Sequence, residues 1–204
     1  MRELLSPEER QRLDPGDDAR FYDRPRFVHH VDEGFRDRLT DLYAESLEVG
    51  DVVLDLMGSW VAHLPDRSFE RVVGHGLNAE ELRANGRYDE WFVRDLNATP
   101  GLDLPDASFD AVTCAVSVQY LQYPGTVFAE VGRVLRPGGV CIVSFSNRMF
   151  LRKAVRGWRE RDMDGRAELV SRYFESMDVF GAPTVVREFP ERDPFYAAVA
   201  RRPK

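Results

Sequence analysis

The 204-residue chain has few cysteines, no long apolar run and no excess of basic charge. The two cysteines, Cys114 and Cys141, lie inside apolar runs, which indicates buried thiols in a reducing compartment rather than a disulfide framework. No stretch approaches the ~18 apolar residues of a membrane span, and the first ten residues do not resemble a signal peptide. We therefore expect a cytoplasmic protein with no membrane partner.

The net charge argues against a nucleic-acid partner, and the spacing of the cysteines and histidines argues against a metal site. The formal net charge of -7 argues against a nucleic-acid partner, because proteins that bind phosphate backbones usually carry a basic face. The two cysteines and four histidines have no metal-ligand spacing, so we expect no metal site. One basic patch is expected to be the solvated face of a helix, and it comprises Arg148, Arg152, Lys153, Arg156, Arg159 and Arg161.

Short apolar runs alternate with helical patterns along most of the chain, which is typical of an α/β fold. The pattern predicts a doubly wound, seven-stranded, mostly parallel sheet, with an antiparallel last strand inserted beside the fifth strand. The strands are expected at residues 51–57, 71–77, 91–96, 109–118, 140–146, 184–189 and 194–200. The helices are expected at residues 33–47, at 79–85, from Pro124 to the PGG of 137–139, and over 149–178 with a break near Asp164-Gly165.

Two parts of the chain are distinguished by composition. Residues 1–48 are expected to form an N-terminal arm followed by helical structure, and residues 1–20 of this arm are charged, irregular and loosely held. Residues 49–204 are expected to form one compact domain. In an open α/β sheet, ligands bind outside the carboxyl ends of the strands. The residues that follow each expected strand are therefore the first candidates for a site.

The segment from Arg94 to Asn147 carries a resemblance to a known family. Its strongest pieces are LPDASFDAV, the helix that ends in RVLRPGG, and the strand after it. This segment resembles the second half of the class I S-adenosylmethionine-dependent methyltransferase domain, in particular its type 11 branch, whose acceptors are small molecules. VLDLMGSW and RVVGHGLNAEEL occupy the positions of that family's first two motifs.

The resemblance implies an S-adenosylmethionine-dependent methyltransferase that acts on a small-molecule acceptor. It implies that Asp95 accepts a hydrogen bond from the adenine amino group and that the N-terminal helices within residues 1–48 form a lid over the cofactor. We expect Tyr22, in that lid, to lie against the methionine end of the cofactor. The full set of expected cofactor-binding residues is Tyr22, Asp55, Met57, Gly58, Ser59, Gly76, Leu77, Asn78, Asp95, Leu96 and Ser117.

The chain departs from the family in its first two motifs. The family has a Gly-x-Gly-x-Gly turn after the first strand, whereas here Gly58 alone remains, and Pro65 shortens the helix expected after that turn. The family ends its second strand with an acidic residue that binds the ribose hydroxyls, and Gly76 stands in its place. Asn78 is expected to substitute, because its amide can both donate and accept hydrogen bonds.

Catalytic groups are expected in the lid and after the fourth strand. On a helix, His29 and His30 would point about 100° apart, so at most one would enter a given pocket. His30 is the preferred base, because Phe27 and Val31 imply a packed face and His30 lies three positions after Phe27, and His29 is the alternative. Gln119 and Tyr120 are the other catalytic candidates, and a substrate-facing role is weighed evenly against a structural one.

Structural interpretations stay open for the remaining candidates. Asp55 could cap the next turn and Asp95 could form an Asx turn. Trp60 could be a core residue or a pocket wall, and His63 a packed histidine. Two other functions also stay open: a regulatory protein that binds the cofactor without catalysis, and an enzyme that uses the sulfonium cofactor for chemistry other than methylation.

Overall fold

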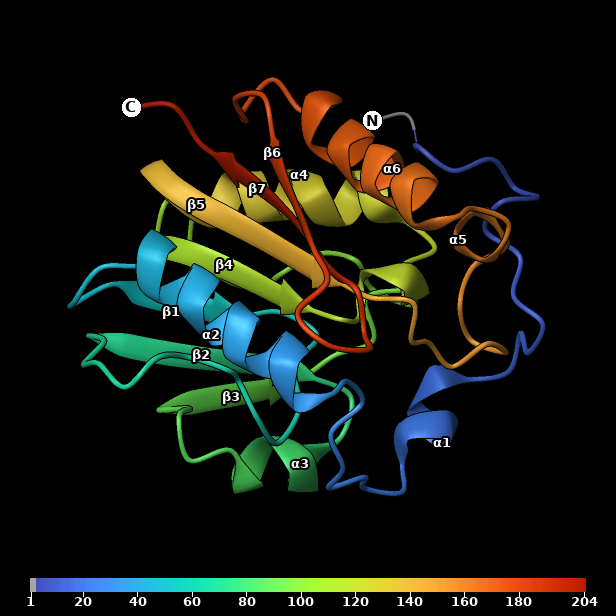
Figure 1. Ribbon diagram of the computed structural model, residues 1–204, viewed down its shortest axis with the longest axis horizontal. Coiled ribbons are helices and arrows are strands. Elements are labelled where there is room, and N and C mark those ends of the chain that lie inside the picture. Colours follow the sequence, from blue (N-terminus) through green and yellow to red (C-terminus); the bar gives the residue numbers. More distant parts are fainter. Residues whose placement is uncertain (1–2) are drawn as a thin grey trace.

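A computed structural model describes residues 3–204 as a seven-stranded sheet with helices on both faces (Figure 1). The strand order is β3-β2-β1-β4-β5-β7-β6. β1 to β5 are mutually parallel, and β7 runs antiparallel between β5 and β6. The predicted fold class is therefore confirmed, including the last strand beside the fifth. The strands are β1 (Val52–Asp55), β2 (Arg71–Gly76), β3 (Glu90–Val93), β4 (Phe109–Ala115), β5 (Leu135–Phe145), β6 (Thr184–Glu188) and β7 (Phe195–Arg201).

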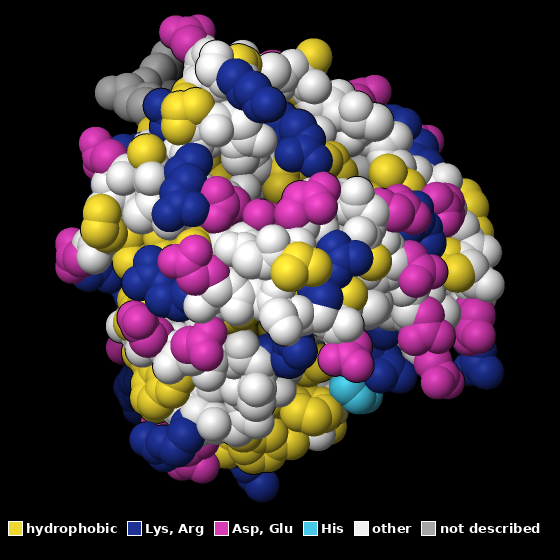
Figure 2. Space-filling view, turned by 90° about the vertical axis from the view of Figure 1, so that its left-hand side faces the viewer, with side chains coloured by type: hydrophobic (Ala, Val, Ile, Leu, Met, Phe, Trp, Pro, Cys, Tyr) yellow, Lys and Arg dark blue, Asp and Glu magenta, His cyan; other side chains and the backbone are white. Residues whose placement is uncertain are grey.

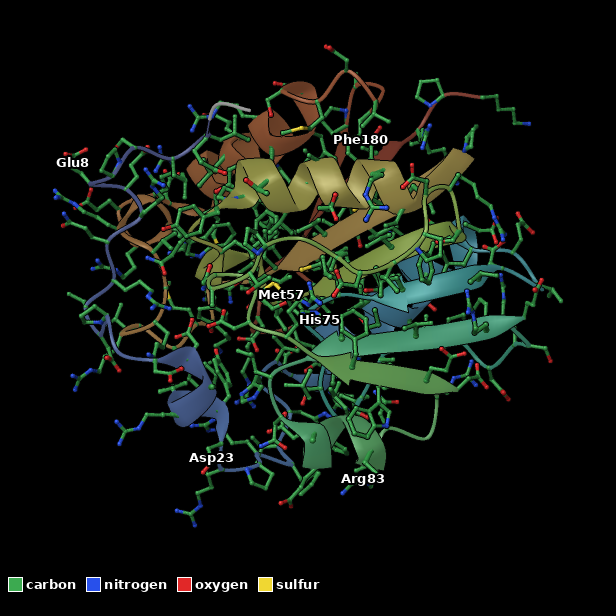
Figure 3. All side chains as sticks on the ribbon, turned by 180° about the vertical axis from the view of Figure 1, so that it is seen from behind. Glu8, Asp23, Met57, His75, Arg83 and Phe180 are labelled. Carbon is green, nitrogen blue, oxygen red and sulfur yellow. The ribbon has the colours of Figure 1, made fainter. Side chains whose placement is uncertain are left out.

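The helices cover the sheet in two layers, with α2 on one face and α4 and α6 on the other (Figures 1 and 3). Neighbouring residues of β1 show this alternation, because Val53 packs in the core cluster that includes α2 and Leu54 in the cluster that includes α4 and α6. The helices are α1 (Asp18–Tyr22), α2 (Glu33–Ser46), α3 (Ala79–Ala84), α4 (Pro124–Val134), α5 (Arg156–Arg159) and α6 (Met163–Glu175), with a 3₁₀ turn η1 at Val118–Tyr120.

Several expected boundaries were wrong. The fourth strand ends at Ala115 instead of 118, because Val116 adopts a left-handed φ of 45° and the chain then forms η1. The helical region 149–178 breaks before Asp162 rather than at Asp164-Gly165, since Asp162 caps α6 by accepting a hydrogen bond from the Gly165 amide. Residues 58–70 contain no helix at all.

The expectation of a loosely held arm was also wrong. Leu5 is buried in the main core, and the Glu3 carboxylate accepts hydrogen bonds from Gly125 and Thr126 at the start of α4. Lys153, placed in a solvated basic patch by its sequence, is 1% exposed and forms an ion pair with the buried Asp18. The arm is therefore packed against the sheet domain.

Cys114 and Cys141 are buried free thiols, as expected. Within residues 3–204, no helix is long and apolar enough to cross a membrane.

Candidate functional site

A cavity of ≈ 290 Å³ lies at the carboxyl ends of β1, β2, β3 and β4. β1 lies between β2 and β4, so the chain leaves it in one direction across the sheet and later returns in the other. Such a switch point leaves a crevice where small ligands bind. The volume is at the lower end of the range for small-molecule sites. Segment 22–31, the turn after β1 and the loop after β5 form the walls.

The turn after β1 is held by hydrogen bonds to its neighbours. Met57 adopts a left-handed φ of 58°, a backbone conformation that favours glycine. The Met57 amide donates to the Nδ1 atom of His75, and the Gly58 amide donates to the His75 carbonyl. Figure 3 shows Met57 and His75 beside each other at the ends of the strands. Asn85 adds a third bond by donating to the Ser59 carbonyl.

His75 is a structural histidine with a defined tautomer. Its Nδ1 atom accepts from Met57, so the proton lies on Nε2, which donates to the Arg94 carbonyl at 2.9 Å. Burial lowers the pKa of His75 to about 4, so the ring is neutral at neutral pH. It joins the turn after β1 to the end of β3.

Asp55 ends β1 and is 2% exposed. Its Oδ2 atom accepts from the Tyr88 hydroxyl at 2.6 Å and its Oδ1 atom from the Thr113 hydroxyl at 3.0 Å. Both donors are side chains of other elements, so the carboxylate does not cap the next turn. Burial raises the pKa of Asp55 to about 7, although the two hydrogen bonds act to lower it.

Gly76 and Asn78, the two positions considered for binding the ribose, have structural roles instead. A Cβ atom on Gly76 would lie 2.5 Å from the Gly58 carbonyl oxygen, so no acidic side chain fits at this position. The side-chain oxygen of Asn78 caps α3 by accepting hydrogen bonds from the backbone amides of Glu80 and Glu81. The side-chain nitrogen of Asn78 donates to the backbone carbonyls of Tyr22 and Asp23. Asn78 therefore anchors the lid, and its side-chain amide has no donor left for a ribose hydroxyl.

Asp95 forms the Asx turn that its sequence left open, and it also reaches the cavity. Its Oδ1 atom accepts from the Asn97 amide at 2.8 Å, which is an Asx turn. Among residues 3–204, its Oδ2 atom accepts no hydrogen bond, and Asp95 lines the cavity. One carboxylate oxygen therefore shapes the loop and the other is left for a ligand.

The lid segment between α1 and α2 brings both His29 and His30 to the cavity. The expectation that at most one would enter was wrong, because residues 23–32 are not helical. The His29 ring lies 4.9 Å from the Trp60 ring, and the His30 ring lies 5.2 Å from the Phe150 ring. Burial lowers the pKa of both histidines. Trp60 is therefore a wall of the cavity rather than a core residue.

All four histidines of the chain line this cavity, including the expected packed residue His63. Burial lowers the pKa of His63 to about 4. Among the described residues, no group of three or more His, Cys, Asp or Glu side chains is arranged to hold a metal ion.

Of the two catalytic candidates after β4, the structure places Tyr120 at the cavity and Gln119 outside it. Tyr120 lines the cavity, its hydroxyl accepts from the Phe150 amide at 2.8 Å, and burial raises its pKa, so the phenol is neutral. Gln119 is 2% exposed and does not line the cavity. Its amide instead donates to the Val116 carbonyl and closes the turn after β4.

Phe150 and Glu81 are cavity residues that sequence reasoning missed. Phe150 follows β5, and its ring contacts those of Tyr22, His30 and Tyr120. Glu81, in the first turn of α3, accepts from the Ser59 hydroxyl at 2.5 Å and from the Arg26 amide at 2.7 Å. The sequence could have indicated Phe150 as a cavity residue, because it follows a strand. It could not have indicated Glu81, because the direction of that side chain depends on the cap at Asn78.

The structure thus brings most of the expected residues to one cavity. Those that line it are Tyr22, His30, Asp55, Met57, Gly58, Ser59, Gly76, Leu77, Asn78, Asp95, Leu96, Ser117 and Tyr120.

Comparison with known proteins gives a sequence match over this same region. Residues 56–143 match the family described as Methyltransferase domain. Over 89 residues the chain is 34% identical to a ubiquinone/menaquinone biosynthesis C-methyltransferase, UbiE, of Desulfotalea psychrophila. That match covers 40% of this chain and 35% of UbiE, so the chain spans about a third of the length of this curated relative.

Solved structures agree in fold at low sequence identity. An S-adenosylmethionine-dependent methyltransferase from Mesorhizobium loti has a TM-score of 0.57 and 18% identity, covering 79% of this chain and 96% of that one. The [4+2]-cyclase SpnF has a TM-score of 0.58 and 17% identity, covering 82% and 80%. The two structures carry the same fold as this chain.

Proposed function

Because residues 56–143 match the methyltransferase domain family, we propose that this chain transfers a methyl group from S-adenosylmethionine to a small-molecule acceptor. The observation that carries the proposal is the coincidence of that matched segment with the cavity. The segment supplies the turn after β1, the end of β2, the Asp95 loop and Ser117, all of which line the same space.

The residues of the cavity fit this cofactor. Asp95 has a free carboxylate oxygen for the adenine amino group, and the apolar residues Leu77 and Leu96 line the same cavity. Asp55 is a buried carboxylate with no cationic partner among residues 3–204, which suits a ligand with positive charge. S-Adenosylmethionine supplies a methyl group that its sulfonium charge has already activated. The remaining task of the protein is to align donor and acceptor and to exclude water.

The acceptor is proposed to lie between the lid and the loop after β5. Phe150, Trp60 and Tyr120 offer apolar surface there, and His30 offers a ring nitrogen that is unprotonated at neutral pH. His30 would accept the proton of an acceptor group that must lose one. Tyr120, a neutral phenol, would hold the acceptor by hydrogen bonding. Gln119 is no longer proposed as catalytic, because it lies outside the cavity.

A small acceptor is favoured over a nucleic acid. The lid segment forms one wall of the cavity, which leaves a volume suited to a small molecule. On the face at the amino ends of the strands, acidic and basic side chains are interspersed (Figure 2). The name of the relative, a ubiquinone/menaquinone biosynthesis enzyme, also supports a small-molecule acceptor. We retain the cytoplasm as the proposed location.

The proposal is tested with purified protein, labelled S-adenosylmethionine and small-molecule extracts, with product masses read by mass spectrometry. The expected result is a product heavier by the labelled methyl group. We expect His30→Ala to lower its formation and His29→Ala to lower it less. Cofactor binding without any product would favour a regulatory protein. A new product with no label would favour non-methylating chemistry, and the cyclase on the same fold makes that outcome worth measuring.

A further inference from the structure

Asp55 occupies an unusual place in the sheet. In the parallel register its neighbours are Gly74 on β2 and Thr113 on β4. Thr113 donates a hydrogen bond to one carboxylate oxygen. Gly74 has no side chain, so the space on the other flank of Asp55 is open to a group from elsewhere.

Tyr88 fills that space from the connection between α3 and β3. A Cβ atom on Gly74 would overlap the Tyr88 ring, and a Cβ atom on Gly58 would overlap the Tyr88 hydroxyl. The ring therefore crosses β2 at Gly74, and its hydroxyl reaches Asp55 Oδ2 at 2.6 Å beneath the turn at Gly58. These two glycines make room for a tyrosine.

We propose that Tyr88 is a positioning residue of this site, whose hydroxyl holds the Asp55 carboxylate at the floor of the cavity, where it attracts a positively charged cofactor. The proposal rests on the proposed function for the identity of that cofactor. The cavity is lined by Asp55 but not by Tyr88, so Tyr88 acts through Asp55.

The surroundings of Asp55 make this contact sensitive to pH. The titratable groups that face it are Tyr88, Tyr43 on α2 and Cys114 on β4, and none of them carries positive charge. Burial therefore dominates and raises the pKa of Asp55 to about 7, while the Tyr88 hydrogen bond lowers it. The carboxylate attracts a cation only when it is ionised, so cofactor affinity rises as the pH increases through this range.

Loss of the Tyr88 hydroxyl should move that dependence to higher pH. The hydroxyl donates to the ionised form, so Tyr88→Phe raises the pKa of Asp55 further. We expect the midpoint of the affinity profile to rise by about one pH unit, and the affinity at pH 7 to fall about fivefold. The phenylalanine ring still fills the space beside Gly74.

The experiment measures S-adenosylmethionine affinity by calorimetry from pH 5.5 to 9 for the wild type, Tyr88→Phe and Tyr43→Phe. Tyr43 is the matched control, because it is a fully buried tyrosine near Asp55 whose hydroxyl does not donate to it. We expect the midpoint to shift in Tyr88→Phe alone. Methylthioadenosine, which has no sulfonium charge and no amino acid group, should show a flat profile in all three proteins.

The outcomes separate the two proposals. If the wild type binds no S-adenosylmethionine at any pH, the proposed function is wrong. If it binds and Tyr88→Phe keeps the wild-type midpoint, only the role of Tyr88 is overturned. Asp55→Asn covers the case in which Tyr88→Phe does not fold. A persistent step near pH 7 in Asp55→Asn overturns the proposal, because another group then titrates. Loss of the step supports the part of the proposal that assigns the pH dependence to Asp55.

Discussion

Position 76 accepts only glycine in this chain, for a steric reason. The turn after β1 passes so close to the end of β2 that the Gly58 carbonyl oxygen fills the place of any Cβ atom on Gly76. The two departures from the family pattern, the altered turn and the missing acid, are therefore one structural change. An acid at position 76 would require the turn to move.

Gly76→Asp should consequently destabilise the protein rather than restore a ribose contact. We expect the free energy of unfolding to fall by at least about 2 kcal/mol, because the side chain meets backbone that cannot easily shift. Chemical denaturation measures this. Gly86→Asp is the matched control, since nothing lies within 4 Å of a Cβ atom there. Equal stabilities of the two variants would contradict the steric account.

His75 makes stability depend on pH in a defined direction. Its pKa in the folded protein is about 4 and its ordinary value is 6.5, so the unfolded chain takes up the proton first. This contribution is complete above pH 6.5 and is lost as the pH falls through 4, by about 3 kcal/mol in total. Asp55, with its raised pKa, acts in the opposite direction between pH 3.8 and 7.

The two effects are separated with His75→Gln. We expect the difference in unfolding free energy between wild type and His75→Gln to shrink as the pH falls from 6.5 toward 4. His29→Gln, at an exposed histidine whose pKa is lowered less than that of His75, should show a smaller change with pH. A constant difference between wild type and His75→Gln would show that His75 does not titrate as its burial requires.

Among the secondary-structure elements, the N-terminal arm and α1 are fixed by buried charge. Asp18 at the start of α1 contacts Arg12 at 2.5 Å and Lys153 at 3.1 Å, and it accepts from Asn97 at 3.0 Å. The Lys153 ammonium also donates to the Gly16 carbonyl. Asn97 belongs to the Asp95 loop, so this cluster joins the arm, the segment before α5 and the expected adenine site.

Lys153→Met should loosen the arm. Removing one member of a buried ion cluster leaves Asp18 undercompensated, and we expect a loss of about 3 kcal/mol in unfolding free energy. Limited proteolysis should then cut earlier within residues 3–17 than in the wild type. Arg152→Met, at the exposed neighbouring residue, is the control. An unchanged cleavage rate in Lys153→Met would contradict a role of the Lys153–Asp18 pair in holding the arm.

The strands, and the place of the last strand beside the fifth, could be predicted from the sequence, because short apolar runs alternate with helical patterns and end in a closing pair of strands. The end of β4 and the break before α6 could not, since they depend on the backbone at Val116 and the cap at Asp162. The arm was misjudged because its charges are paired across the fold with residues such as Lys153.

At the scale of the whole molecule, the site is a property of the topology. Residues far apart in the sequence meet because β1 to β4 end at one edge of the sheet, and this much could be predicted. The hydrogen-bond partners of each side chain could not be predicted. Asn78 was expected to bind ribose, yet its amide is used by the α3 cap and the lid. Tyr88 gave no signal, because its contact with Asp55 depends on a glycine in the neighbouring strand.

The central claim is that the cavity at the ends of β1 to β4 binds the S-adenosyl cofactor through Asp95. Its most direct test is calorimetric titration of the wild type, Asp95→Ala and Asp178→Ala with S-adenosylhomocysteine; Asp178 is exposed and outside the cavity. We expect one site per chain in the wild type, unchanged binding in Asp178→Ala, and a loss of ~1–3 kcal/mol, roughly tenfold to a hundredfold, in Asp95→Ala. Absence of binding to the wild type, or equal affinity in Asp95→Ala, would contradict the account.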